Sequence, residues 1–204
     1  TKKEFQRKLD LAKNRMYCNY AFYFGATADN AHELADLKNL EGCCGIKLFA
    51  GSSTGNLLVA DEKDIETVFK NSSKVVAVHS EDEAILSVNK KLIKKGDVHS
   101  HPIWRSEECA ISSTRRIVRI AERYNKKAHV LHITTKQEID FLSQHKGNIT
   151  FEITPQHLTI YAPDCYDKLG TYAQMNPPIR DKSHYDRLWY AVKNNLNDTI
   201  GSDH

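Results

Sequence analysis

The feature that most constrains the fold is a regular alternation of short apolar runs with amphipathic stretches. The apolar runs lie at residues 20–24, 45–49, 75–79, 129–133, 149–153 and 199–203. Each run has the length of a strand, and apolar residues recur at helical spacing between them. Strands that alternate with helices pair in parallel through right-handed crossovers. We therefore predict an α/β fold with six parallel strands in one domain.

Helices are expected at residues 3–15, 30–37, 61–69, 81–94, 106–124, 136–145 and 182–195. The long helix at 106–124 has Ser106 at its start with acidic residues directly after it, which is typical of a capped and charge-stabilised N-terminus.

Composition excludes several functional classes. The 204 residues carry 29 Lys and Arg against 26 Asp and Glu, a net charge of +3 without a basic cluster, so we expect no nucleic-acid partner. No apolar stretch approaches a membrane span and the polar start lacks a signal-peptide core, so we expect a cytoplasmic protein that binds no membrane. The five cysteines lack CxxC spacing, which indicates reduced thiols.

Polar residues at the strand ends distinguish between the two candidate architectures, a doubly wound sheet and a TIM-type barrel. Lys47, His79, His132, Glu152 and Asp203 lie within or at the ends of successive apolar runs. Functional side chains at the carboxyl ends of many strands are typical of a barrel. No strand is followed by a glycine-rich nucleotide-binding motif. The pattern favours a TIM-type (β/α)8 barrel.

Two imidazoles and a carboxylate from separate strands would suit a divalent cation such as zinc. A metal of this kind supports hydrolysis, because it acidifies bound water and polarises a carbonyl. Each residue also has a structural alternative. His79 and His132 could be hydrogen-bonded core residues, Lys47 could form an ion pair, and Asp203 could cap the next element.

Seven motifs occur in an order that closely resembles the dihydroorotase family of the amidohydrolase superfamily, in its allantoinase-like and hydantoinase-like group. They are GIKLFAGSSTGNLLV (45–59), VHSEDE (78–83), HPIWRS (101–106), HVLHITTKQEI (129–139), FEITPQHL (151–158), MNPPIR (175–180) and GSDH (201–204). The resemblance extends over nearly the whole chain.

The resemblance implies a distorted (β/α)8 metal-dependent hydrolase barrel, of which this chain contains about strands three to eight. It implies that Lys47, as a carboxylated lysine, bridges two zinc ions, and that His79 and His132 are ligands from the fifth and sixth strands. Asp203 matches the eighth-strand aspartate, which contacts metal and transfers the proton. The implied reaction opens the cyclic amide of dihydroorotate reversibly to N-carbamoyl-aspartate, in pyrimidine biosynthesis.

Further positions follow from the same resemblance. Asn176 matches a residue that faces the substrate, although its neighbouring prolines equally predict a turn. Glu152 and His157 lie in a motif near the metals and are expected either to orient the ligands or to bind metal directly. The glycine-rich loop with Gly51, Ser52, Ser53 and Gly55 is expected to shape the mouth of the site, and His101 and Arg105 are expected to hold a surface loop.

The sequence departs from the family pattern at both ends. The first-strand HxH pair, the arginine after it and the second-strand asparagine are not in this sequence, and neither is the APH that usually follows GSDH. We therefore expect a segment of a longer enzyme, without the first barrel strands and without the remainder of a β-rich domain. The 204-residue form alone is expected to have little activity, because one metal would lack two ligands.

Two other functions stay open. A related cyclic amidase, acting on hydantoins, dihydropyrimidines or allantoin, would use the same metal-site positions. A non-catalytic homologue would act as a structural partner, with aspartate transcarbamoylase as the candidate. We also expect a homodimer.

Overall fold

The computed structural model describes residues 1–51 and 56–203 of the chain. In this part of the chain, six strands form one sheet in sequence order, and every neighbouring pair is parallel. The strands are β1 (Phe22–Gly25), β2 (Cys43–Phe49), β3 (Val76–His79), β4 (Ala128–Val130), β5 (Ile149–Ile153) and β6 (Thr199–Ile200). The predicted parallel α/β architecture is confirmed.

Helices connect the strands. The α-helices are α1 (Lys2–Ala12), α2 (Glu62–Asn71), α3 (Glu83–Asn89), α4 (Ser100–Trp104), α5 (Glu107–Arg123), α6 (Lys136–Leu142), α7 (Pro155–Thr159), α8 (Asp164–Leu169) and α9 (Lys182–Lys193). Three 3-10 helices are η1 (Ala31–Asn39), η2 (Lys90–Leu92) and η3 (Gly170–Ala173).

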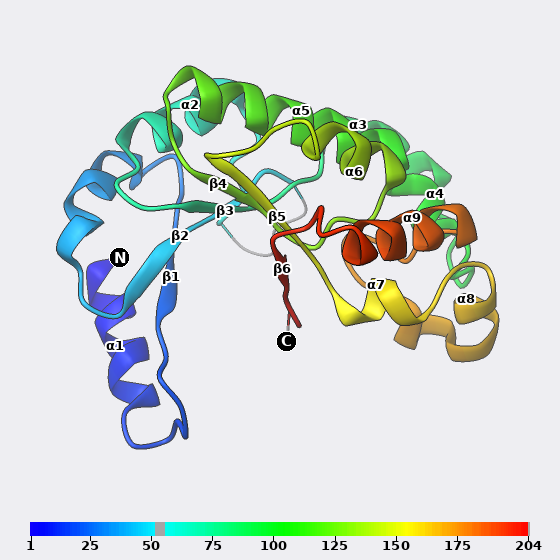
Figure 1. Ribbon diagram of the computed structural model, residues 1–204, viewed down its shortest axis with the longest axis horizontal. Coiled ribbons are helices and arrows are strands. Elements are labelled where there is room, and N and C mark those ends of the chain that lie inside the picture. The colour runs from blue at the N-terminus through cyan, green and yellow to red at the C-terminus, as the bar shows by residue number, and fades with distance from the viewer. Residues whose placement is uncertain (52–55, 204) are drawn as a thin grey trace.

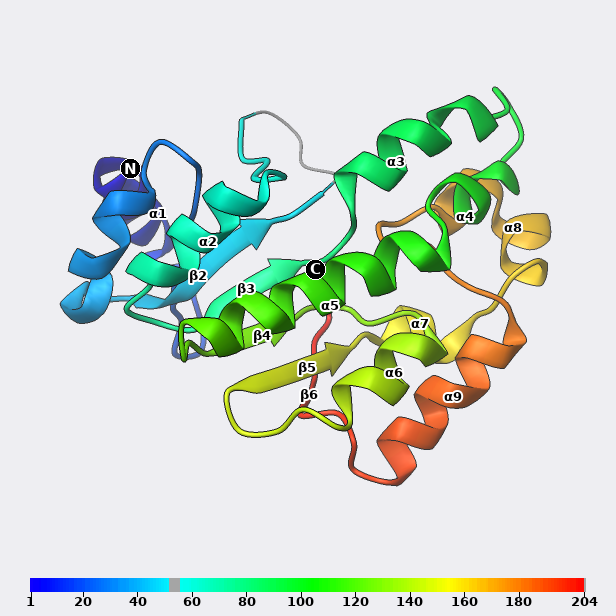
Figure 2. The ribbon, with the colours of Figure 1, turned by 90° about the horizontal axis from the view of Figure 1, so that it is seen from above.

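The helices form a layer outside the curved sheet. Helices α2, α5 and α6 lie along one side of the strands, and α5 runs over the sheet when the molecule is seen from above (Figures 1 and 2). Neighbouring helices contact one another in the order η1, α2, α5, α6 and α9. This is the arrangement of a barrel wall, with strands inside and helices outside.

The alternation of side chains along the strands explains why this layer forms. In β2, Ile46 and Leu48 are fully buried in the core against the helices, whereas Lys47 between them belongs to the opposite face. In β5, Phe151 is buried in the same core, and Glu152 next to it is partly exposed. The strands therefore direct apolar residues outward to the helices and polar residues toward the barrel interior.

Several predicted boundaries need correction. The segment predicted as a helix at 30–37 is the 3-10 helix η1, and the helix predicted from residue 81 starts at Glu83. Asp82 is the reason for the later start, because its carboxylate accepts hydrogen bonds from the backbone N–H groups of Ala84 and Ile85. Ser106 caps α5 as predicted and accepts from the N–H of Cys109.

Strand β4 is shorter than the predicted strand at 129–133. It ends at Val130, and His132 has a φ of +40°, which is incompatible with a continued strand. The short helices α4, α7 and α8 were not predicted from the sequence. Helices of five or six residues have too few turns to produce a recognisable period.

Candidate metal centre

The ends of β2, β3 and β4 bring predicted ligands together. Phe49 at the end of β2 is paired with His79 at the end of β3. The N–H of Leu131 donates a hydrogen bond to the carbonyl of Val78, which holds the segment after β4 beside β3. His132 therefore lies next to His79, although 53 residues separate them.

The two imidazoles face each other in the interior. Nδ1 of His79 lies 3.2 Å from Nε2 of His132, with the ring centroids 4.8 Å apart. The residues are only 4% and 2% exposed. Such a short distance between two ring nitrogens requires a proton or a cation between them, because two bare lone pairs would repel.

His132 is buried without the full set of hydrogen bonds expected of a core histidine. Burial, followed by the charges of His79 and Lys47, holds its pKa well below the usual range, so the ring is neutral at pH 7. Its Nδ1 is buried and has no hydrogen-bond partner in the described part of the chain. Its left-handed backbone conformation is uncommon for a residue with a side chain, and such conformations are concentrated at functional sites.

Lys47 lies in the middle of β2, paired with Gly25 on one side and Ala77 on the other. Its Nζ lies over the ring of Phe49 at 4.7 Å from the centroid, and no carboxylate of the described residues forms an ion pair with it. Burial lowers its pKa to about 8, with Asp203 and Glu152 opposing the shift. The lowered pKa raises the fraction of neutral amine, which is the form that adds carbon dioxide.

Burial raises the pKa of the Asp203 carboxyl, and the charges of Lys47 and His79 oppose this shift. The residue is exposed and has a φ of +52°. Among residues 1–51 and 56–203, its carboxylate does not join the two imidazoles in a group whose ligand atoms all lie within 4.8 Å. The structure therefore places Asp203 beside the histidine pair and not within it.

Glu152 belongs to a polar layer of the barrel interior. Its Oε2 lies 3.4 Å from Nε2 of His129, and Nδ1 of His129 lies 2.8 Å from the hydroxyl of Thr150. A Cβ atom at Gly201 would lie 2.4 Å from the carboxylate, so the chain after β6 passes directly over Glu152. Its charge acts on Lys47 and Asp203.

His157 is buried, but both ring nitrogens are already engaged. Nδ1 lies 2.6 Å from the hydroxyl of Thr154, and Nε2 lies 3.1 Å from the carbonyl of Pro177. A carbonyl accepts only, so Nε2 carries the proton and Nδ1 accepts from the hydroxyl. His157 thus ties α7 to the loop before α9 and has no free nitrogen for a metal. Burial lowers its pKa to about 4.

Asn176 lies in that same loop, and its side chain is exposed without a hydrogen bond to any described residue. The neighbouring backbone is anchored on both sides. The carbonyl of Met175 accepts from Nε2 of His101, and the carbonyl of Pro177 accepts from His157. Asn176 is therefore available to a bound molecule, and its substrate contact stays a prediction.

The glycine-rich loop is described only at its start. Ser52, Ser53 and Gly55 lie outside the described residues. A Cβ atom at Gly51 would lie 2.3 Å from the carbonyl oxygen of Glu81, so only glycine allows this close approach. Gly51 thereby fixes the backbone just after His79.

Glu81 and Arg105 are the site residues that sequence reasoning missed. Oε2 of Glu81 lies 2.7 Å from Nε2 of His79, and the guanidinium of Arg105 pairs with the same carboxylate oxygen. Glu81 is 0% exposed and Arg105 is 2% exposed, so the expectation that Arg105 holds a surface loop is wrong. A carboxylate two residues after a predicted ligand was the available signal for Glu81. The contact of Arg105, 24 residues away, had no sequence signal.

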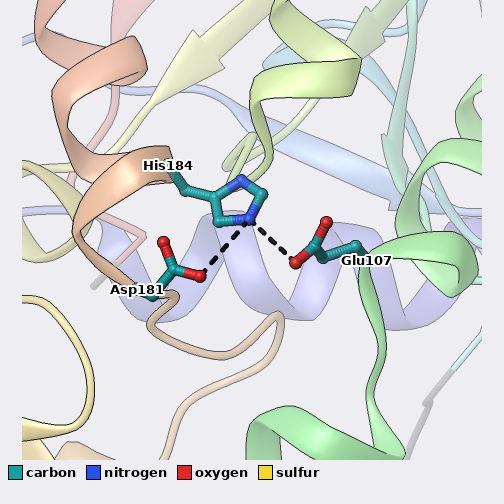
Figure 3. A group of neighbouring side chains, drawn as sticks. All are labelled: Glu107, Asp181 and His184. Carbon is teal, nitrogen blue, oxygen red and sulfur yellow. Dashed lines mark ion pairs between the residues drawn. The ribbon is translucent and has the colours of Figure 1, made fainter.

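A second group of potential ligands lies where α5 and α9 begin. Figure 3 shows Glu107, Asp181 and His184 with their ligand atoms turned toward one another. Nδ1 of His184 accepts the backbone N–H of Lys136 at 3.0 Å, so Nε2 carries the proton that it donates to Glu107 at 2.9 Å. The histidine has no free lone pair, and the group joins α5, α6 and α9 without a metal.

The residues at the strand ends fit a divalent zinc ion better. Two buried imidazoles converge there through Nδ1 of His79 and Nε2 of His132, and the charge of a lysine with a lowered pKa acts on His132. Neutral imidazole nitrogen is a preferred zinc ligand. An amine needs to lose its proton before it could contribute, which the lowered pKa favours.

The chain is similar to known proteins over its whole length. The chain is 27% identical to the dihydroorotase of Methanosarcina mazei, matched over the whole chain and 47% of that protein. It is 26% identical to the L-hydantoinase of Paenarthrobacter aurescens, over 98% of the chain and 45% of that protein. The chain therefore spans about half the length of the curated relatives it matches. No family model matches it.

Solved structures show the same fold. The L-hydantoinase (dihydropyrimidinase) of Arthrobacter aurescens superposes with a TM-score of 0.90 at 25% identity, over 98% of this chain and 46% of that one. A D-hydantoinase superposes with a TM-score of 0.85 at 25% identity, over the whole chain and 47% of its own length.

The parallel strands, the outer helices and the polar strand ends define part of a TIM-type (β/α)8 barrel, covering about strands three to eight. Its curated relatives are dihydroorotases, an L-hydantoinase and allantoinases, so the chain is similar to cyclic amidohydrolases. No helix of the described residues is long and apolar enough to cross a membrane.

Proposed function

We propose that the protein containing this chain is a zinc-dependent dihydroorotase, which opens the cyclic amide of dihydroorotate reversibly to N-carbamoyl-aspartate in pyrimidine biosynthesis. The observation that carries this proposal is the pair of buried imidazoles, 3.2 Å apart at the ends of β3 and β4, with Lys47 and Asp203 close by. The dihydroorotase relatives matched over the whole chain support the choice of substrate.

His79, His132 and a carboxylated Lys47 would hold the metal in this proposal. When bound, zinc would supply an acidified water and polarise the amide carbonyl. Asp203 is exposed and interacts electrostatically with Lys47 and His79, and in this proposal its carboxylate would face the bound substrate. There it would accept the proton of the attacking water and return it to the ring nitrogen as the amide bond breaks.

Two further residues would contribute to the electrostatics of the site and to substrate binding. Glu152 lies in the polar layer around Lys47, where its charge favours cationic neighbours. Asn176 is exposed in the loop before α9 and would contact the substrate. The substrate carboxylate would require a cationic partner. Homodimer formation and binding of aspartate transcarbamoylase remain parts of this proposal.

A related cyclic amidase is the second candidate, because the L-hydantoinase structure superposes on nearly the whole chain with a TM-score of 0.90. The metal site would be the same in both functions. The two differ in the substrate, since hydantoins lack the ring carboxylate of dihydroorotate.

The test uses the full-length protein that contains this chain, loaded with zinc in the presence of bicarbonate. Turnover of dihydroorotate, hydantoin and allantoin is compared in one preparation. We expect dihydroorotate to be opened fastest, and Asp203→Asn to lower its turnover by about 100-fold or more. Asp186→Asn, on the exposed surface of α9, is the matched control and should leave turnover unchanged.

Faster opening of hydantoin or allantoin would favour the second candidate. Absence of turnover with all three compounds by zinc-loaded protein would contradict both.

A further inference from the structure

We propose that Glu81 and Arg105 are positioning residues, which fix the imidazole of His79 with its proton on Nε2 and its bare Nδ1 toward His132. The inference rests on the proposed function, because it assigns these residues a role in presenting a zinc ligand. It gives a role at the site to two residues that lie in the motifs VHSEDE and HPIWRS but were not predicted as site residues.

The first step is the contact between Glu81 and His79. Oε2 of Glu81 lies 2.7 Å from Nε2 of His79, and the carboxylate is completely buried. An ionised carboxylate can only accept a hydrogen bond, so the ring nitrogen that faces it, Nε2, carries a proton. Nδ1, on the other side of the ring, then has its lone pair free.

The second step is the support of Glu81 by Arg105. The guanidinium of Arg105 pairs with the carboxylate oxygen that contacts His79, and it lies 4.9 Å from the ring centroid of Trp104. A buried carboxylate without a cation would be costly to keep ionised. Arg105 therefore maintains Glu81 as an acceptor.

The third step is the rigidity of the surroundings. The backbone carbonyl of Arg105 accepts a hydrogen bond of 2.5 Å from Nη1 of Arg180, which is itself buried. On the other side, the carbonyl of Glu81 lies against Gly51, where no side chain would fit. Arg180 and Gly51 thus contact the backbone of both residues of the Glu81–Arg105 pair.

The consequence lies at the other edge of the ring. Nδ1 of His79 lies 3.2 Å from Nε2 of His132, so the tautomer set by Glu81 directs a lone pair to the point where the two rings meet. Histidines that bind metals commonly donate their other N–H to a carboxylate, which fixes both tautomer and ring orientation. The geometry of His79 has this form.

The direct test is nitrogen NMR of the zinc-free full-length protein, labelled with 15N-histidine, near neutral pH. We expect Nε2 of His79 to be protonated and Nδ1 to be unprotonated. A proton on Nδ1, or on both nitrogens, would overturn the proposal. This measurement needs no variant of Glu81 or Arg105, so it stays decisive even if such variants do not fold.

A second test measures zinc affinity by competition with a chelator. Glu81→Gln should weaken binding by about 10- to 100-fold. The amide can donate to Nε2, which allows the proton to move to Nδ1. The matched control is Glu138→Gln, because Glu138 is also a buried carboxylate but bonds to Thr114 and Thr135 instead.

Equal zinc affinity of the Glu81→Gln variant and the wild type would refute the role of Glu81. An equal loss in the Glu138→Gln control would also refute it, since the loss would then be a general effect of a buried substitution. Neither readout uses turnover. If the proposed function is wrong, the wild type will bind zinc and show the predicted tautomer but open no cyclic amide.

Discussion

Replacing Gly51 with alanine tests whether the start of the glycine-rich loop is packed as tightly as the structure indicates. The new Cβ would lie 2.3 Å from the carbonyl oxygen and 2.9 Å from the carbonyl carbon of Glu81. Ordinary contacts begin at about 3.4 Å, so the oxygen would be about 1 Å too close. The clash is with backbone, which cannot rotate away as the end of a side chain can.

Forcing extra volume into a packed interior costs about 1–3 kcal/mol. We therefore expect Gly51→Ala to lower the free energy of unfolding by this amount, measured by urea denaturation as a lower midpoint at unchanged slope. It should also weaken zinc binding, because a shift of Glu81 moves its carboxylate relative to His79.

Gly25→Ala is the matched control for this substitution. A Cβ at Gly25 would meet only the side chain of Leu57, at 3.6 Å, and its backbone is outside the left-handed region. Alanine there restricts the unfolded chain and should be neutral or stabilising by up to about 1 kcal/mol. Equal free energies of unfolding for Gly51→Ala and Gly25→Ala would contradict a tight contact between position 51 and the backbone of Glu81.

Two further predictions concern stability. The pKa of His157 is about 4 in the folded state and about 6.5 in the unfolded chain. The unfolded state therefore binds a proton at higher pH than the folded state, and the free energy of unfolding decreases as pH falls from 6.5 to 4. The free energy of unfolding should be lower by about 3 kcal/mol at pH 4. His157→Gln should reduce this pH dependence, measured by urea titrations at several pH values. The same pH dependence in the variant and the wild type would contradict the prediction. Ser106→Ala should lower the free energy of unfolding by about 1 kcal/mol, because the N–H of Cys109 loses its capping hydrogen bond. Ser106→Asp should retain most of the wild-type stability, because aspartate can also accept this hydrogen bond. Equal losses of stability in the two variants, measured by thermal unfolding, would argue against capping.

The periodicity of the sequence was sufficient to predict the framework of the fold. Alternating burial in β2 and β5 follows directly from alternating apolar and polar residues, and Ser106 identifies the start of α5. The prediction was poorer where tertiary contacts decide the backbone. The strand predicted at 129–133 ends at Val130, because His132 takes a left-handed conformation beside His79.

The candidate site also combines positions that follow from the sequence pattern with contacts that depend on tertiary structure. The positions of Lys47, His79 and His132 on successive strands predict that they lie on one side of the sheet, since parallel strands bring their carboxyl ends together, and their role as metal ligands stays a prediction. The contact of Arg105 with Glu81 could not be identified, because an ion pair between distant segments leaves no periodic trace in the sequence. The two engaged nitrogens of His157 were equally hidden, since one partner is a backbone carbonyl 20 residues away.

The sequence by itself determined which residues alternate between the helices and the barrel interior, because that pattern depends on neighbours one to four positions apart. Only the tertiary structure decided which nitrogen of His79 is free, where Glu81 and Arg105 meet, and why position 51 is glycine. These features depend on distances between segments far apart in the chain, which are fixed when the strands pair and the loops pack over their ends.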